Sequence, residues 1–383
     1  MKIVQKNIKL VKIFMTALII TLLAFMILAS FGCKKETPTE DTKIDVEKTT
    51  TTVQASTTET TNKSISELKI TGNINILTGF EISDNVLSTR PFAIMINNAP
   101  EARPQSGLNK ADVVIEVVDE GGITRLIGVF SSKDADVIGP IRSARQYYAE
   151  LSRMFDPIYV FWGTYPEGYK LIENMDMDVL TPLGDDPKTG ASKIIANMSD
   201  GIDAWRDSSR VAPHNAYSSM EKLKAAAEKN GYSLGEGQSP FSFKLDNSEQ
   251  KRGNVNEIKI DFSVESFSAG FTYDKSSNNY KKSTSGNYDV DRETNENLYF
   301  NNVIALVTDI VNSGDSSGHM IVRTSGSGKA FYFFDGNVLE GTWERTIILE
   351  PMEFKDTSGN EILLNRGSTY IGMVQGSDRV IYW

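Results

Sequence analysis

The sequence predicts an α+β protein in which a mixed α/β domain precedes a mostly antiparallel β domain. Between residues 68 and 237, short apolar runs rich in β-branched and aromatic residues alternate with helical patterns. From residue 238 to residue 383, closely spaced strand patterns are separated by turn residues such as Asp335-Gly336-Asn337. The length of 383 residues leaves room for both domains. We expect the second domain to be a small sandwich or a curled sheet.

The N-terminus, residues 1–33, has the pattern of an export signal. An apolar run from Ile13 to Phe31 leads to Gly32-Cys33, and it is preceded by Lys2, Lys6, Lys9 and Lys12. This positive flank should stay in the cytoplasm, which places the rest of the chain outside the membrane. Cys33 is the one cysteine of the chain, so no intramolecular disulfide can form.

The mode of anchoring has two interpretations. Gly32-Cys33 at the end of an apolar run resembles a bacterial lipobox, whose cysteine is lipidated, although Ser30 stands where a branched apolar residue is usual. The alternative is an uncleaved N-terminal transmembrane helix, since about 20 apolar residues span a bilayer. Both interpretations tether the protein to the outer face of the cytoplasmic membrane. Residues 34–67 are rich in Thr, Glu and Lys, and we expect them to form a disordered tether.

Composition excludes several classes of function. The net charge of −10 argues against nucleic acid as a partner, because proteins that bind it present basic surfaces. With only His214 and His319, which fall in different predicted domains, we expect no metal site, and no motif indicates a cofactor. The sequence has no G-x-S-x-G nucleophile elbow, and Cys33 belongs to the export signal, so a Ser or Cys nucleophile is not expected either.

The secondary structure of the first domain follows from its periodicity. The predicted strands cover residues 92–97, 112–118, 125–130 and 158–162. A helix is expected to begin near Ile141, directly after Gly139-Pro140, and to run to Phe155. A second helix is expected from Ser218 to Asn230, with Ser218 and Glu221 at capping-box spacing.

Arg142 and Arg145 carry the first candidate site. In the first turn of the expected helix they would lie at the positive end of the helix dipole, which disfavours cations by a few tenths to about 1 kcal/mol. A bound phosphate or carboxylate would compensate this cost. Acidic residues of the same domain would compensate it equally well, so both interpretations stay open.

Glu116, Asp119 and Glu120 form the second candidate site. If Gly121-Gly122 makes a two-residue hairpin turn, Arg125 is diagonal to Glu116 on one face of the hairpin. The three carboxylates then either pair with arginines to fix the fold or form the acidic wall of a cleft with a general acid.

His214 and Tyr165 complete the candidates. His214 lies between Pro213 and Asn215, just before the predicted helix at Ser218, where an imidazole either binds an anion, moves a proton or is structural. Tyr165 follows the strand at 158–162 in an aromatic stretch, "FWGTYPEGY". Aromatic residues here serve either the core or a surface for a ligand or partner, and Tyr165 and Tyr169 are the pair expected to be exposed.

Long motifs in the same order resemble the YerB-like lipoproteins of Gram-positive bacteria, a family with domains of unknown function. They include "GPIRSARQYY", "RVAPHNAY" and "GSGKAFYFFDGNVLEGTWER", and the resemblance covers residues 72–383. It implies an α/β part followed by a β-rich part in an exported, membrane-anchored protein. It implies no activity, so Arg142, Arg145, Pro213, His214 and Asn215 are site candidates without assigned roles.

The leading hypothesis from the sequence is a membrane-anchored binding protein for an anionic cell-envelope ligand or a protein partner. It would use Arg142, Arg145, His214, Asn215 and Tyr165. The alternative is a hydrolase or lyase that acts on a cell-wall polymer, with Glu116, Asp119 or Glu120 as acid and His214 as base. The sequence leaves open whether the protein is an enzyme.

Overall fold

The structure is a computed structural model that describes residues 68–83 and 89–383. These residues belong to one compact unit, Asn62–Trp383. The predicted signal segment, the tether and Cys33 lie outside the described residues. Within the described ranges, no helix is both long and apolar enough to cross a membrane.

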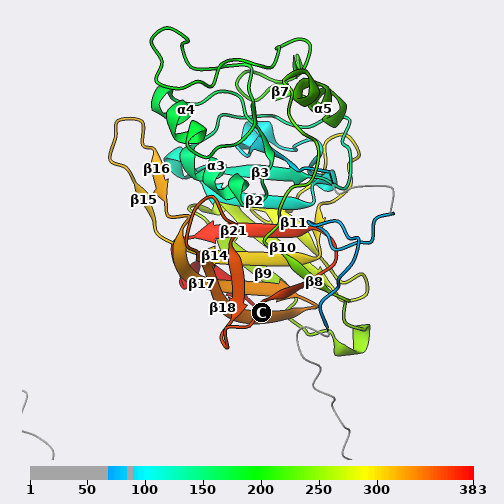
Figure 1. The fold of residues 1–383 in the computed structure, drawn as a ribbon. Helices are drawn as coiled ribbons and strands as arrows, with labels where there is room; N and C mark the ends of the chain where they lie inside the picture. The colour runs from blue at the N-terminus through cyan, green and yellow to red at the C-terminus, as the bar shows by residue number, and fades with distance from the viewer. Residues whose placement is uncertain (1–67, 84–88) are drawn as a thin grey trace, which may run out of the picture. The chain divides into compact units, whose positions relative to one another are not determined.

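A mixed ten-stranded sheet is the centre of the unit (Figure 1). Its strands, in spatial order, are β19 (Glu353–Asp356), β18 (Asn337–Arg345), β17 (Gly326–Phe334), β14 (Asn302–Val307), β21 (Thr369–Val374), β2 (Val113–Val118), β3 (Thr124–Phe130), β1 (Phe92–Asn97), β4 (Ile158–Val160) and β5 (Val179–Leu180). Parallel pairing joins β14 to β21, β21 to β2, β1 to β4 and β4 to β5.

The sheet joins the two halves of the sequence. β21, from the second half, pairs in parallel with β2, from the first half, with Val113 opposite Thr369 and Glu116 opposite Gly372. The predicted boundary at residues 237/238 lies between the last helix of the first half and the first strand of the second. The partition into two domains stays a prediction. Backbone hydrogen bonds between β2 and β21 connect the segment before residue 237 to the segment after it.

The remaining elements flank this sheet. A six-stranded sheet consists of β12 (Asn287–Tyr288), β11 (Asn279–Thr284), β10 (Ser268–Asp274), β9 (Glu257–Asp261) and β22 (Val380–Tyr382), with β13 (Tyr299–Phe300) paired to β11. Three strand pairs are β15 (Ile310–Asn312) with β16 (Met320–Val322), β8 (Ser242–Lys244) with β20 (Leu363–Asn365), and β6 (Trp205–Arg206) with β7 (Ala216–Tyr217). The α-helices among the described residues are α3 (Gln146–Arg153), α4 (Pro166–Glu173) and α5 (Met220–Lys229).

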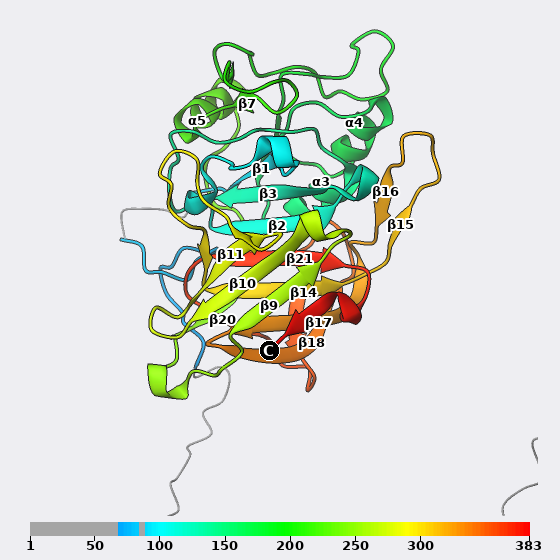
Figure 2. The ribbon, with the colours of Figure 1, turned by 180° about the vertical axis from the view of Figure 1, so that it is seen from behind.

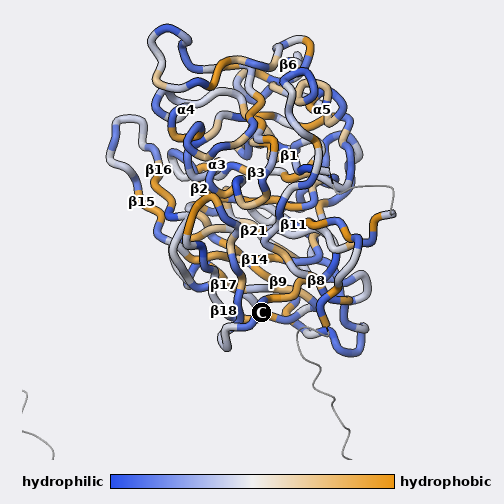
Figure 3. Tube along the Cα trace, viewed as in Figure 1, coloured by the Kyte–Doolittle hydropathy of each residue, from blue (hydrophilic) through white to orange (hydrophobic). Residues whose placement is uncertain are grey.

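Alternating side chains of the central strands build a separate core on each face of the sheet. On β1, Met95 belongs to the core that α3 and α4 cover, whereas Ile94 and Ile96 belong to the core beneath α5 and the six-stranded sheet. In Figure 1, α3 and α4 lie in front of the central sheet. Figure 2 shows the opposite face, where the six-stranded sheet lies in front of the central one. The apolar residues of the central strands are orange in Figure 3.

The described residues are mostly β with a few helices, the first half mixing helices and strands and the second half mostly strands. β1 coincides with the predicted strand at 92–97, and β2, β3 and β4 lie at the other three predicted strands. The predicted cap of the last helix was wrong by one residue. Ser219, not Ser218, is the N-cap of α5, and its side chain accepts a hydrogen bond from the Lys222 amide.

Candidate functional site

The segment before α3 is extended, so the predicted helix start at Ile141 was wrong. The amide of Ile141 donates to the carbonyl of Ala216 at 2.6 Å, and the amide of Arg142 donates to the carbonyl of Met95 at 2.9 Å. These amides pair with other parts of the chain, and α3 begins only at Gln146 with Arg145 as its N-cap residue. Arg142 therefore lies outside the helix, and the helix dipole does not explain its position.

The hairpin between β2 and β3 also differs from the predicted one. The strands pair Val118 with Thr124, so the connection spans five residues rather than two, with positive φ at Gly121 and Gly122. Glu116 is opposite Leu126 and Val117 is opposite Arg125. Because side chains alternate along a strand, Glu116 and Arg125 point to opposite faces of the sheet. The predicted diagonal contact between them is absent.

Three arginines gather where β2 ends and β3 begins, on the face covered by α3. We define the arginine cluster as Arg125, Arg142 and Arg145 with the carboxylates of Asp119 and Glu120. Arg125 Nη2 lies 2.6 Å from Asp119 Oδ2, and its Nη1 donates to the Ser143 carbonyl at 2.6 Å. Arg145 donates to both carboxylate oxygens of Glu120, with Nη2 2.9 Å from Oε2. Two of the three guanidinium groups are thus paired with carboxylates.

Arg142 is the unpaired member of the cluster. Its guanidinium is half-buried, and within the described part of the chain it makes no hydrogen bond or ion pair. Burial, together with the positive charges of Arg125 and Arg145, lowers the pKa of Arg142 to about 10, against the opposing effect of the carboxylates of Asp119 and Glu120. The side chain is still charged at neutral pH. A half-buried charge without a partner is costly, and a ligand with an anionic group would supply the missing partner.

The pKa values of the two carboxyl groups of the cluster are shifted in opposite directions. Burial acts to raise the pKa of Glu120, but the hydrogen bonds from Arg145 and the positive charges of Arg145 and Arg125 together outweigh it and lower this pKa to about 2. Burial raises the pKa of Asp119, against the attraction of Arg125. Asp119 also accepts a hydrogen bond from the Tyr147 hydroxyl at 2.9 Å. Both groups are occupied by protein partners.

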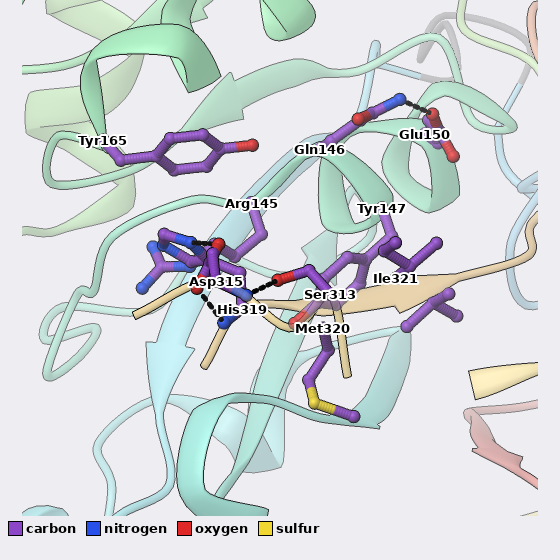
Figure 4. A pocket seen from close by; sticks show the side chains of 11 residues that line it. Arg145, Gln146, Tyr147, Glu150, Tyr165, Ser313, Asp315, His319, Met320 and Ile321 are labelled. Atoms are coloured by element: carbon purple, nitrogen blue, oxygen red, sulfur yellow. Dashed lines mark hydrogen bonds and ion pairs between the residues drawn. The ribbon is translucent and has the colours of Figure 1, made fainter. Parts of the chain in front are cut away.

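A small cavity of about 210 Å³ opens beside Arg145, between the start of α3 and the hairpin of β15 and β16. Figure 4 shows the Tyr165 ring above Arg145 and His319. The rings of Tyr165 and His319 lie 4.7 Å apart at 34°, and His319 Nδ1 is 2.6 Å from Asp315 Oδ2. Tyr165 thus lines the cavity, and its role toward a ligand stays a prediction. His319 is a member that sequence reasoning missed, because no local pattern links it to residues some 170 positions earlier.

His214 and Asn215 have hydrogen-bond partners outside the arginine cluster. The Asn97 side-chain amide is 2.8 Å from His214 Nδ1, and with the amide as donor the ring proton is on Nε2. Asn97 is opposite Arg125 in the register of β1 and β3. Asn215 accepts from Arg206, whose guanidinium stacks 4.1 Å from the Trp162 ring. Among the described residues, no hydrogen bond or ion pair joins His214 or Asn215 to Arg142 or Arg145.

Two comparisons place the chain among known proteins. Residues 77–233 match the family model described as "Protein of unknown function (DUF3048) N-terminal domain", and residues 258–371 match the corresponding C-terminal domain. A protein named "Putative lipoprotein YerB" from Bacillus subtilis (strain 168) is 34% identical over 271 residues, which are 70% of this chain and 77% of that protein. The chain belongs to this YerB-like family.

A solved structure from the same family agrees with this assignment. The crystal structure of YerB protein from Bacillus subtilis has a TM-score of 0.67 and 30% identity to the chain, and the match covers 81% of this chain and 99% of that one. The arginine cluster lies within the segment that matches the N-terminal YerB-like domain, whereas His319 lies within the C-terminal match. The cavity beside Arg145 is therefore formed by both YerB-like domains.

Glu116 lies in a separate network that also joins the two YerB-like domains. Its carboxylate accepts hydrogen bonds from Thr124 and Tyr370, at 2.6 Å each, and from Asn98 at 3.0 Å. Buried Lys282 lies 3.7 Å from it and is itself paired with Asp289 at 2.6 Å. A buried carboxylate with this many partners fixes the packing of the two sheets. No group of three or more metal-ligating side chains is present in residues 68–83 and 89–383.

Proposed function

We propose that this YerB-like protein is an exported, membrane-anchored binding protein whose ligand carries a carboxylate or phosphate group. The ligand's anionic group pairs with Arg142 at the arginine cluster. The observation that carries the proposal is the imbalance of three guanidinium groups against two carboxylates, with Arg142 left half-buried and unpaired among the described residues. A guanidinium presents two parallel donors, which suit a carboxylate or a phosphate.

The surroundings of Arg142 support binding of an anion. Arg125 and Arg145 are close enough to lower its pKa, so an anion at Arg142 experiences three positive charges and two negative ones. Tyr165 and His319 offer ring surfaces beside Arg145 for the uncharged part of the ligand. Both arginine partners are fixed by ion pairs and backbone carbonyls, so the site is ordered before a ligand arrives.

The contacts favour binding over hydrolysis. A general acid must hold a proton near neutral pH, yet the pKa of Glu120 is lowered to about 2. Glu116 is buried on the opposite face of the sheet and accepts three hydrogen bonds. His214 contacts Asn97 rather than a carboxylate. Burial raises the pKa of Asp119, but this carboxyl is only 2% exposed and is held by Arg125 at 2.6 Å, so it is not open to a substrate. We therefore place the hydrolase alternative second.

A thermal titration of the compact unit Asn62–Trp383 tests the proposal. Glycerol 3-phosphate is paired with glycerol, and N-acetyl-D-alanine with its uncharged amide, so that each pair differs only in the anionic group. We expect a rise in the melting temperature of several degrees at ligand concentrations near 100 times Kd, since this contributes about 2.7 kcal/mol. No rise with either anion, beyond the effect of ionic strength, would contradict the proposal.

We propose lipidated Cys33 as the anchor. In bacteria that express the full chain, labelled palmitate should be incorporated into the parent protein and not into Cys33→Ser. An uncleaved transmembrane helix would instead leave both proteins unlabelled, because its apolar run holds the chain in the membrane without a lipid.

A further inference from the structure

A second cavity, of about 550 Å³, lies at the other end of the strands that carry the arginine cluster. Its walls come from the starts of β2 and β21, the end of β3 and the segment 68–83. The arginine cluster lies at the far end of β2, six residues or about 20 Å away at ~3.3 Å per residue. In both views the segment 68–83, drawn in blue, lies on the side away from the hairpin of β15 and β16 (Figures 1 and 2). This cavity is therefore separate from the site beside Arg145.

The walls of the cavity are fixed to one another by hydrogen bonds. The Gly367 amide donates to the Thr78 carbonyl at 2.8 Å, and the Ser368 hydroxyl donates to the Tyr299 carbonyl at 3.0 Å. The Thr369 amide donates to the Asp112 carbonyl at 2.9 Å. These bonds join segments from both halves of the chain. The cavity is preformed, and its volume lies within the range of about 300–1,000 Å³ that is usual for ligand sites.

Two aromatic rings on the wall are exposed. Phe80 is 49% exposed and Tyr299 is 45% exposed, although each lines the cavity. The guanidinium of Arg366 lies over the Phe80 ring at 5.4 Å and restrains its orientation. Exposed rings on the wall of a preformed cavity provide apolar faces for a flat, partly apolar ligand.

The other side chains on the wall are polar and nearly balanced in charge. Asp112 and Glu296 are acidic residues, and Lys133 is a basic one. Lys133 and Asn297 have no side-chain partner in the described ranges, so they are available to a ligand. A wholly apolar ligand would leave these groups unpaired, and an anion would meet two carboxylates. A ligand with many neutral hydroxyl or amide groups satisfies both constraints.

We propose that this cavity binds a neutral pyranose sugar of a glycan. The ring's C–H face stacks on Phe80 or Tyr299, and its hydroxyl groups, which both donate and accept, bond to Asn297 and Lys133. The site is independent of the anion site proposed above. An exported, membrane-anchored protein would meet such sugars in the cell envelope.

The test uses the full-length chain in a zwitterionic detergent without sugar headgroups. Tetra-N-acetylchitotetraose and cellotetraose are titrated, and binding is followed by saturation-transfer NMR of the sugar ring protons. We expect at least one of them to bind, with saturation strongest on the C–H face of the ring. In the double variant Phe80→Ala/Tyr299→Ala the affinity should fall at least tenfold, and Asn297→Ala should weaken it several-fold.

Two control variants show whether the sugar binds at this cavity. Tyr288→Ala removes an equally exposed tyrosine outside the cavity and should leave the affinity unchanged. Arg142→Gln should also leave the affinity unchanged, so the sugar result does not depend on the anion proposal. The wall aromatics are half exposed, so the melting temperature of the double variant should stay near that of the parent, and Asn297→Ala provides a second test if it does not. Absence of binding by both sugars, or equal binding by the wall variants, would overturn the proposal.

Discussion

Arg142 and Arg145 lie three residues apart, yet Arg145 donates to both carboxylate oxygens of Glu120 while Arg142 has no partner in the part of the chain that the structure describes. The difference arises because α3 begins at Gln146, which leaves Arg142 in an extended segment that is held by Met95 and Trp162. We therefore propose different roles for the two arginines: Arg145 stabilises the fold, and Arg142 binds the ligand's anionic group.

Replacement of Arg142 should stabilise the unliganded protein. Arg142→Gln removes a half-buried charge without a partner, so the free energy of unfolding in urea should rise by roughly 1 kcal/mol. Arg379→Gln, just before β22, removes an arginine whose side chain is 40% exposed and should change it by less than about 0.5 kcal/mol. A loss of stability in Arg142→Gln would show that this side chain has a structural partner.

Arg145 and Glu120 should be coupled strongly. A double-mutant cycle with Arg145→Ala and Glu120→Ala should give a coupling energy of about 1–3 kcal/mol, because each single variant removes the nearest partner of a partly buried charge. The exposed pair Lys329 and Glu340 is a matched control, and its coupling should be below about 1 kcal/mol. Equal coupling energies in the two cycles would contradict the structural role assigned to Arg145.

The same ion pair should make stability depend on acid pH. The pKa of Glu120 is lowered to about 2 in the folded protein, below its ordinary value near 4.5. Its contribution to stability is therefore present above about pH 4.5 and is lost as the pH falls toward 2. Urea unfolding at a series of pH values should show a shallower loss in Glu120→Gln than in the parent over this window. Parallel curves would mean that Glu120 is not held ionised by Arg145.

Glu116 should affect stability but not binding of anions. Glu116→Gln places a donor amide among the donors of Thr124, Tyr370 and Asn98, so we expect a loss of about 2–4 kcal/mol in the free energy of unfolding. Affinity for an anionic ligand at Arg142 should stay within twofold of the parent at temperatures where the variant is folded. A loss of affinity in a folded Glu116→Gln protein would show that Glu116 contributes to the ligand site.

Local patterns were sufficient to predict strands β1 to β4 but not how the strands assemble into sheets. β1 was predicted residue for residue, because a short run of β-branched and apolar residues flanked by turn residues is a local signal. The start of α3 was wrong because the amides of Ile141 and Arg142 pair with Ala216 and Met95, contacts that no local periodicity encodes. The pairing of β2 with β21 is equally non-local.

The candidate site was predictable only in part, because some of its contacts depend on non-local pairing of the chain. Arg145 and Glu120 were both candidates, but the face of Arg125 depended on the register of the hairpin, which five connecting residues rather than two determine. His319 reaches the cavity only because β15 and β16 project toward α3, from a segment that matches the other YerB-like domain. Nothing in the residues around His319 signals that position.

The dissociation constant of an anionic ligand, measured by calorimetry on the unit Asn62–Trp383, tests the central claim most directly. The ligand is whichever of glycerol 3-phosphate and N-acetyl-D-alanine gives the larger thermal shift, and the proteins are the parent, Arg142→Gln and Arg379→Gln. Loss of a charge-assisted hydrogen-bonded pair should weaken binding at least tenfold in Arg142→Gln and leave Arg379→Gln unchanged. Equal dissociation constants in all three proteins, or no binding by the parent, would contradict the assignment of Arg142 as the anion-binding residue.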